Sequence, residues 1–163
     1  VLWARAPDED DAHWALRRQV WEEPDVLLGG SDAGAHLDRM CGASYPTQFL
    51  ADTIRGRQLV SLERAVQMMT SIPAELIGLR GRGRIDVGAV ADLVVFDPQT
   101  VGAKPARLVN DLPGGAPRLT ADSTGVHRVF VNGVITVADG VATGTLPGTV
   151  LRSGRDTTTV TPR

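Results

Sequence analysis

The pattern of the sequence changes near residue 81, and this change constrains the fold more than any other feature. Before it, apolar residues recur at the spacing of helix faces, as in residues 12–23 and 61–70. After it, glycines separate short runs rich in valine and isoleucine, which are typical of antiparallel strands joined by turns. We therefore expect an α/β chain, with helices in residues 1–80 and mostly β structure in residues 81–163.

Helices are expected to fill most of the first part. In residues 12–23, Ala12, Leu16 and Val20 form an apolar stripe, and charged residues lie on the opposite face. Further helices are expected at residues 47–57, 62–70 and 73–78, the last of them ended by Gly78.

A short apolar run, residues 26–28, stops at Gly29 and Gly30 and is followed by Asp32 and His36. The run does not alternate with polar residues, which is typical of a strand buried on both faces of a parallel sheet. The glycines allow the chain to turn where a side chain would collide. The pattern predicts a strand whose exit loop presents a carboxylate and an imidazole.

Turn signals recur along residues 81–163. Asn132 and Gly133 lie between two valine-rich runs, which predicts a type I′ hairpin, and Asp139 and Gly140 repeat the signal. Two more strands are expected around a turn at Gly88. The remaining segments are expected to be a long surface connection, residues 99–125, and a frayed tail, residues 155–163.

Composition excludes some classes of partner. The chain has 17 basic and 19 acidic residues and a net charge of -2, so no basic face is available for nucleic acid. No apolar run reaches the length of a membrane span, and the first residues lack the regions of a signal peptide. A single cysteine, Cys41, cannot form an internal disulfide, which fits a cytoplasmic location. The chain begins with Val1, and we expect it to be a piece of a longer protein.

Two stretches together resemble a known family. Residues 83–97 fit the pattern Gly-x-Ile-x-x-Gly-x-x-Ala-Asp-Leu-Val-Val-x-Asp, which resembles the metal-dependent amidohydrolases as a superfamily. Ser31 and Asp32, after an apolar run and two glycines, and the helical residues 61–79 resemble the N-acyl-D-amino-acid deacylase (D-aminoacylase) branch. The resemblance extends from about residue 25 to residue 152.

The resemblance implies a fold for the complete enzyme. Members of the family have a (β/α)8 barrel that carries a small β-sandwich made from both chain ends, and their active site lies at the C-terminal mouth of the barrel. Residues 26–28 would be the eighth barrel strand. The chain would then be a C-terminal fragment, with the end of the barrel in residues 1–80 and part of the sandwich in residues 81–163.

The resemblance also implies roles for the loop residues. Asp32 would be catalytic, because it would bind or face the zinc ion and move the proton of the attacking water. His36 would contact the carboxylate of an N-acyl amino acid, although a solvated histidine is nearly as well supported. Ser31 would orient Asp32 or fill the turn. The reaction would be hydrolysis of the amide bond of N-acyl-D-amino acids or related amides.

The metal site itself is incomplete in this chain. A complete family member has a His-x-His pair and further ligands, whereas His13, His36 and His127 are scattered along the sequence. A catalytic zinc needs three or more protein ligands, so Asp32 could bind it only together with ligands absent from this chain. We therefore expect the chain alone neither to retain zinc nor to catalyse. Cys41 does not correspond to the bridging cysteine of the deacylases.

Simpler interpretations stay open beside these roles. An aspartate after Gly-Gly-Ser is in general more often a turn residue than a catalyst, and this holds for Asp32 unless the resemblance is considered. The tryptophans are expected to pack against barrel elements and to be exposed without them. The other residues singled out are expected to be solvated (Asp38, Arg39), to fix turns (Asp92, Asp97) or to fill the core (Met68, Met69).

Two functional classes therefore remain open for the chain. The first is part of a hydrolase of N-acyl-D-amino acids or related amides. The second is a non-catalytic α/β domain that serves assembly or binding. In either class, apolar faces and open strand edges would be covered by self-association or by the missing N-terminal part of the enzyme.

Overall fold

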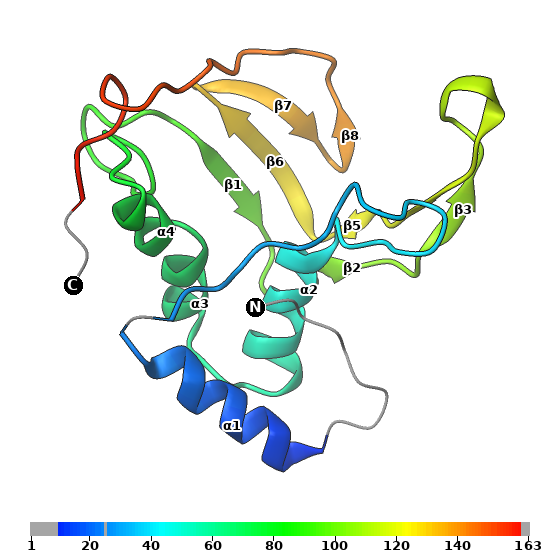
Figure 1. The fold of residues 1–163 in the computed structure, drawn as a ribbon, viewed down its shortest axis with the longest axis horizontal. Coiled ribbons are helices and arrows are strands. Elements are labelled where there is room, and N and C mark those ends of the chain that lie inside the picture. Colours follow the sequence, from blue (N-terminus) through cyan, green and yellow to red (C-terminus); the bar gives the residue numbers. More distant parts are fainter. Residues whose placement is uncertain (1–9, 25, 161–163) are drawn as a thin grey trace. The chain divides into compact units, whose positions relative to one another are not determined.

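The computed structural model describes residues 10–24 and 26–160, which form a mixed α/β structure (Figure 1). The chain divides into two compact units. The first unit combines Val1–Leu62 with Pro98–Gly125, and the second combines Glu63–Asp97 with Val126–Arg163. Each unit is therefore assembled from two separate stretches of sequence. The predicted domains of the complete enzyme, residues 1–80 and 81–163, stay a prediction.

The helices of the first unit are α1 (Asp11–Glu22), α2 (Tyr45–Leu50) and the π-helix η1 (Ala51–Gly56), into which α2 continues. Asp10 caps α1, because its carboxylate accepts a hydrogen bond from the backbone N–H of His13 at 3.0 Å. The helices predicted at residues 12–23 and 47–57 are confirmed. Within the described residues, no helix is both long enough and apolar enough to cross a membrane.

The core of the first unit is built from aromatic side chains. Trp21 packs edge-on against Phe49, with ring centroids 5.5 Å apart, and Trp14 is only 3% exposed. The apolar stripe of Ala12, Leu16 and Val20 is not the buried face of the helix, since Leu16 is 58% and Val20 42% exposed. Burying two large indole rings removes more apolar surface from water than burying the smaller stripe, and this sets which face of α1 points inward.

The tryptophans also correct an expectation about exposure. Trp14 and Trp21 are buried, although they were expected to lose their cover outside a complete barrel. The guanidinium groups of Arg17 and Arg57 lie 4.8 and 4.6 Å from the Trp14 ring centroid and cover it. Trp3 lies outside the described residues.

The predicted strand at residues 26–28 is wrong. These residues have no regular structure, and no described segment forms a ladder with them. A strand is defined by hydrogen bonds to a neighbouring strand, so an apolar run alone is not sufficient.

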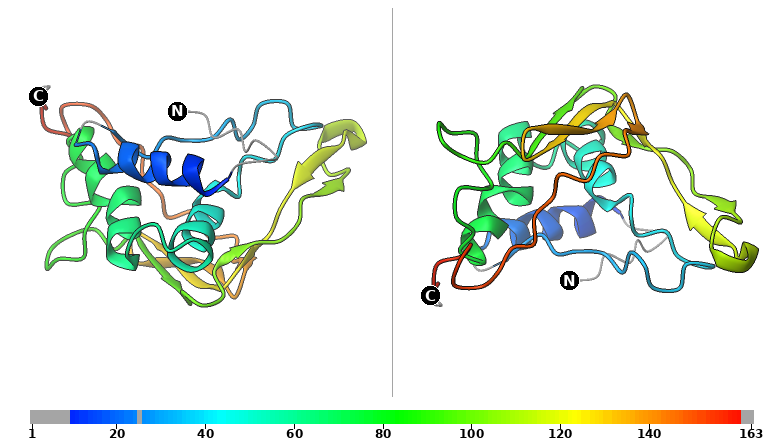
Figure 2. Two further views of the ribbon diagram at one scale, coloured as in Figure 1. Left: turned by 90° about the horizontal axis from the view of Figure 1, so that it is seen from below. Right: turned by 90° about the horizontal axis from the view of Figure 1, so that it is seen from above.

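Residues 99–125 contain short β-ladders, so the predicted irregular connection is also wrong. Strand β3 (Arg107–Val109) pairs with β4 (Arg118–Thr120), and the two run side by side toward a turn (Figure 2). Ion pairs stabilise this ladder, for example between Arg118 Nε and Asp111 Oδ1 at 2.6 Å. The remaining elements of this stretch are β2 (Gly102–Ala103), η2 (Pro113–Gly115) and β5 (Ser123–Thr124).

The helices of the second unit, α3 (Leu62–Met69) and α4 (Ser71–Leu76), lie where the sequence places them. Met68 is buried in α3, which confirms its interpretation as a core residue. Helix α4 begins two residues before Pro73 and is followed by Gly78, whose φ is +66°. The left-handed conformation at Gly78 gives the helix the expected stop.

The sheet of the second unit has the strand order β1-β6-β7-β8 and is antiparallel. Both predicted hairpins are confirmed, because Asn132 and Gly133 have φ values of +49° and +77°, and Asp139 and Gly140 have +49° and +80°. The strands are β1 (Leu93–Phe96), β6 (Val126–Val131), β7 (Val134–Ala138) and β8 (Val141–Ala142).

Two other predictions in the second unit are wrong. Only β1 forms next to the turn at Gly88, and the expected strand before it is an exposed loop in which Val87 is fully exposed. The tail is held as far as Thr158, since Arg80 N–H donates to Asp156 O at 3.0 Å and Thr158 N–H donates to Gly78 O at 2.8 Å. Residues 161–163 of the predicted tail lie outside the described residues. Backbone hydrogen bonds of this kind hold a polar segment that has no helical or strand period.

Candidate active site

The loop of residues 29–42, which lies in the first unit, carries the predicted site residues. It is shaped by two local turns: Ala35 N–H donates to Asp32 O at 2.9 Å, and Met40 N–H donates to His36 O at 2.9 Å. His36 has a φ of +47°, a conformation that non-glycine residues adopt mainly in tight turns. The backbone of this loop therefore brings Asp32 and His36 into consecutive turns.

Ser31 takes part in the first of these turns. Its Oγ accepts a hydrogen bond from the backbone N–H of Ala33 at 3.2 Å. Gly42 comes back against it, because a Cβ added at Gly42 would lie 3.1 Å from the Ser31 Cβ. The loop thus closes on itself at Ser31, and a role of this side chain toward a substrate stays a prediction.

The side chains of Asp32 and His36 are exposed to solvent. Both residues are exposed, and within the described part of the chain neither side chain has a hydrogen bond or an ion pair. The Asp32 carboxylate is therefore open to solvent. The catalytic role of Asp32 and the substrate-binding role of His36 stay predictions.

The loop also has a connection to the β-ladder of the same unit. Leu119 N–H in β4 donates to Leu37 O at 2.7 Å. Beside this bond, Arg39 Nε lies 3.2 Å from Asp38 Oδ2, and both side chains are more than half exposed. Asp38 and Arg39 therefore form a solvated ion pair, which agrees with the interpretation made from the sequence.

The described residues do not meet the requirement for a zinc site. No group of three His, Cys, Asp or Glu side chains among them could hold a metal ion. The His13 side chain contacts Asp10, the N-cap of α1, with Nδ1 2.7 Å from Asp10 Oδ1. His127 Nδ1 lies 3.9 Å from Asp139 Oδ1. Asp32 and His36 would provide two donors at most.

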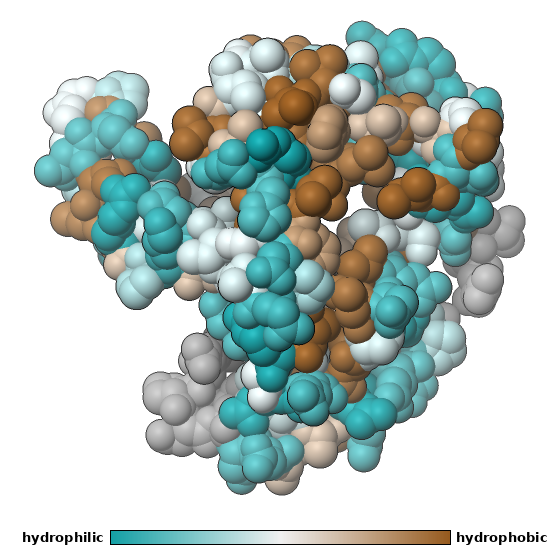
Figure 3. Space-filling view, turned by 180° about the vertical axis from the view of Figure 1, so that it is seen from behind, coloured by the Kyte–Doolittle hydropathy of each residue, from teal (hydrophilic) through white to brown (hydrophobic). Residues whose placement is uncertain are grey.

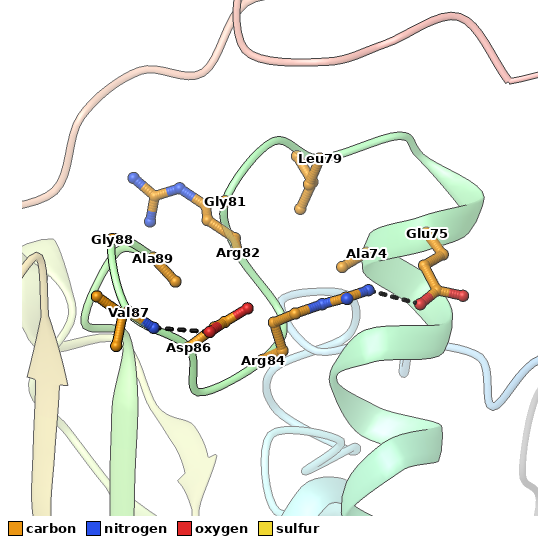
Figure 4. A pocket seen from close by; sticks show the side chains of 10 residues that line it. All are labelled: Ala74, Glu75, Leu79, Gly81, Arg82, Arg84, Asp86, Val87, Gly88 and Ala89. Carbon is orange, nitrogen blue, oxygen red and sulfur yellow. Dashed lines mark hydrogen bonds and ion pairs between the residues drawn. The ribbon is translucent and has the colours of Figure 1, made fainter.

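A pocket in the second unit was not anticipated from the sequence. It has a volume of about 390 Å³ and lies beside α4 (Figure 4). Its polar groups already have partners: Arg84 Nη2 is 3.0 Å from Glu75 Oε1, and Asp86 Oδ1 accepts from Val87 N–H at 2.8 Å. The signal for it is the repeated glycines 81, 83 and 88, each with a positive φ. Its paired charges give no indication of a ligand.

The comparison with protein families decides the identity of the chain. The model of the amidohydrolase family matches residues 11–140. The chain belongs to the amidohydrolase family. This match includes both the loop that carries Asp32 and the hairpin of β6 and β7, and it confirms the resemblance found in the sequence.

Related amidohydrolases narrow the resemblance further. An N-acyl-D-glutamate deacylase from Alcaligenes xylosoxydans xylosoxydans is 37% identical over 118 residues, which cover 71% of this chain and 22% of that protein. A D-aminoacylase from the same organism is 36% identical over 142 residues, or 81% of this chain and 28% of that protein. The chain therefore spans about a quarter of the length of these relatives.

Solved structures of amidohydrolases were also found. A crystal structure of D-aminoacylase is 36% identical, has a TM-score of 0.49 and is matched over 61% of this chain and 19% of that chain. A structure of N-acyl-D-glutamate deacylase from Bordetella bronchiseptica, complexed with zinc and a phosphonate inhibitor, is 37% identical with a TM-score of 0.44, over 58% of this chain and 19% of that chain.

Proposed function

We propose that the chain is part of an enzyme that hydrolyses the amide bond of N-acyl-D-amino acids. The observation that carries this proposal is the 36–37% identity to an N-acyl-D-glutamate deacylase and a D-aminoacylase, which extends over 71% and 81% of the chain. The family model, which matches residues 11–140, includes both Asp32 and the residue 83–97 motif. Identity over more than two thirds of the chain supports a common reaction more strongly than the residue 83–97 motif alone.

In the complete enzyme, residues 1–80 would form the end of a (β/α)8 barrel and residues 81–163 part of a β-sandwich. The order of the elements, with helices up to Leu76 and strands from Leu93, supports this division, which differs from the two compact units of the 163-residue chain. Residues 26–28 would become the eighth barrel strand once neighbouring strands supply hydrogen bonds. The loop of residues 29–42 would then leave the carboxyl end of a strand, where barrels place their active sites.

Asp32 would move protons during the reaction. Its carboxylate would accept the proton of the attacking water and return a proton to the departing nitrogen, so that one group serves as base and then as acid. The support for this role is the match of the family model to residues 11–140, which include Asp32. His36 would hold the substrate carboxylate, and Ser31 would keep the turn in shape.

Zinc is proposed for the longer enzyme only. Asp32 and His36 cannot form a catalytic zinc site by themselves, so the other ligands would have to come from outside these residues. A two-donor site binds zinc weakly, and we expect elemental analysis of the dialysed 163-residue chain to return much less than one metal per chain.

We also propose that the second unit is covered by another surface in the working protein. Strands β1 and β8 are the edges of its sheet, and Val94 and Val141 on them are 56% and 69% exposed. Apolar side chains are open at the surface of the structure (Figure 3). Open edges with apolar side chains favour pairing with another chain, either a second copy or the missing N-terminal part of the enzyme.

The proposed reaction is tested by an assay on a longer protein that contains this chain. Purified protein is given N-acetyl-D-glutamate, N-acetyl-D-leucine and their L-enantiomers, and the release of free amino acid is measured. We expect hydrolysis of at least one D-substrate with little turnover of its L-enantiomer. Turnover of L-substrates alone, or of none of the four by a metal-loaded protein, would contradict the proposal.

A further inference from the structure

The turn of the β6–β7 hairpin is held by residues that precede β1 in the chain. The backbone N–H of Asn132 donates to Asp92 Oδ1 at 2.9 Å, and Arg82 Nη2 donates to Asn132 Oδ1 at 3.1 Å. Arg82 also forms an ion pair with Asp92, and its side chain is only 16% exposed. We call Arg82 and Asp92 the clamp.

The remaining polar groups of the turn are also engaged. Asn132 Nδ2 donates to Pro147 O at 2.6 Å, and Gly133 N–H donates to Ala91 O at 2.9 Å. Asn132 is half-buried and Gly133 is exposed, so water reaches the turn. Both hydrogen-bonding atoms of the Asn132 carboxamide and the backbone nitrogen after it are therefore held in fixed positions.

These atoms are the ones that react when an Asn-Gly sequence deamidates. The backbone nitrogen of the glycine attacks the asparagine Cγ, a new N–C bond forms, and ammonia leaves with the transferred proton. Water then opens the resulting succinimide to aspartate or isoaspartate. Glycine offers the least steric resistance to the attack, since it has no side chain.

We propose that Asn132 is a latent deamidation site, which the clamp keeps unreactive in the folded chain. To reach Asn132 Cγ, the Gly133 nitrogen must leave Ala91 O and the carboxamide must leave Arg82 and Pro147. Opening the clamp releases the backbone at Asn132 and makes this rotation possible. In the product a carboxylate oxygen replaces the Nδ2 donor and cannot donate to Pro147 O, so the modified turn cannot close in its original form.

The experiment follows deamidation in the 163-residue chain at mildly alkaline pH by peptide mass spectrometry. Folded wild type should react at Asn132 far more slowly than the same chain in denaturant. Arg82→Gln and Asp92→Ala should raise the rate in the folded chain by about tenfold or more, the factor expected when a hydrogen bond to a charged group is lost.

Two controls separate the clamp from general loosening. Arg128→Gln removes an ion pair with Asp139, at 2.5 Å, at the opposite end of β6 and β7 and should leave the rate at Asn132 unchanged. Asn110, which is exposed and followed by Asp111, serves as the internal reference in every sample. Circular dichroism establishes that each variant is folded, and Asp92→Asn replaces Asp92→Ala if the latter unfolds.

The proposal is overturned if folded wild type deamidates at Asn132 as fast as the denatured chain. It is equally overturned if folded clamp variants keep the wild-type rate, or if Arg128→Gln accelerates the reaction as much as they do. A faster reaction at Asn132 in the clamp variants, with an unchanged rate at Asn110, supports it.

Discussion

The two units of the chain are stabilised in different ways. The first buries large side chains, including Trp14, Trp21 and Phe49, whereas the buried hydrophobic residues described in the second are small or flexible, namely Ala65, Met68 and Ala74. None of the described strand residues of the second unit's sheet is fully buried. The second unit relies instead on close backbone packing and on polar contacts between distant residues. A unit with an uncovered sheet is better suited to be completed by a partner than to be stable by itself.

The largest effect is expected from the aromatic core of the first unit. Trp21→Ala should lower the free energy of unfolding by about 3–5 kcal/mol, because it removes a buried ring and leaves a cavity against Phe49. Urea unfolding followed by circular dichroism measures this loss. The matched variant Leu16→Ala, on the exposed side of α1, should cost less than about 1 kcal/mol. Equal losses in the two variants would contradict the assigned orientation of the helix.

In the second unit, we expect a large loss of unfolding free energy from substitution of Gly78. A Cβ at Gly78 would lie 2.4 Å from Thr158 O, and the φ of +66° disfavours any other residue. Gly78→Ala should therefore destabilise the chain by about 2–4 kcal/mol, since backbone strain and overpacking add. Gly144 also has a positive φ but no atom within 4 Å, so Gly144→Ala should cost only about 1–2 kcal/mol. A smaller loss for Gly78→Ala than for Gly144→Ala would show that the tail does not pack here.

The uncovered sheet leads to a prediction about association. Sedimentation of the 163-residue chain at micromolar concentration should show dimers or larger species, because the edge strand β1 exposes Val94 and Val95. Val94→Lys places a charge on this edge and should shift the distribution toward monomer, while Thr143→Lys, beyond β8, should shift it less. A compact monomer of the wild type at all concentrations would remove the argument for a partner.

The smallest effect concerns the tail of the second unit. Hydrogen bonds from Arg155 and from the Arg152 N–H hold the pKa of the Asp156 carboxyl below its ordinary value. The folded pKa is therefore lower than the unfolded one, so this stabilisation is complete above about pH 4 and is lost as the pH falls through the folded pKa. Urea unfolding at several pH values should show wild type losing its small advantage over Asp156→Asn in acid. A constant difference would contradict the pairing.

Local turn chemistry made part of the fold predictable. Asn132 and Gly133 require positive φ in a tight hairpin, so their sequence nearly dictates the structure. The strand expected at residues 26–28 would need hydrogen bonds from adjacent strands, which the residues next to it in the sequence do not supply. The inward face of α1 depends on a competition between two tryptophans and a smaller stripe, which periodicity alone does not resolve.

The candidate site could be located but not completed from the sequence. The succession of apolar run, glycines and Asp32 predicts a loop that carries Asp32 and His36, and the structure places both residues in consecutive turns of one loop. The partners of Asp32 in catalysis would come from other barrel strands, which no local pattern in these 163 residues describes. The contact of Leu37 with β4 was missed because it joins residues far apart in the chain.

The central claim is that Asp32 moves protons during amide hydrolysis, and a single comparison of kcat tests it most directly. In a longer protein that contains this chain, Asp32→Asn keeps the size of the side chain but removes the proton acceptor, so kcat should fall by about 10²-fold or more. Asp38→Asn, a second exposed carboxylate of the same loop, is the matched control and should keep near-normal turnover. An Asp32→Asn enzyme with wild-type metal content and near-normal kcat would contradict the account.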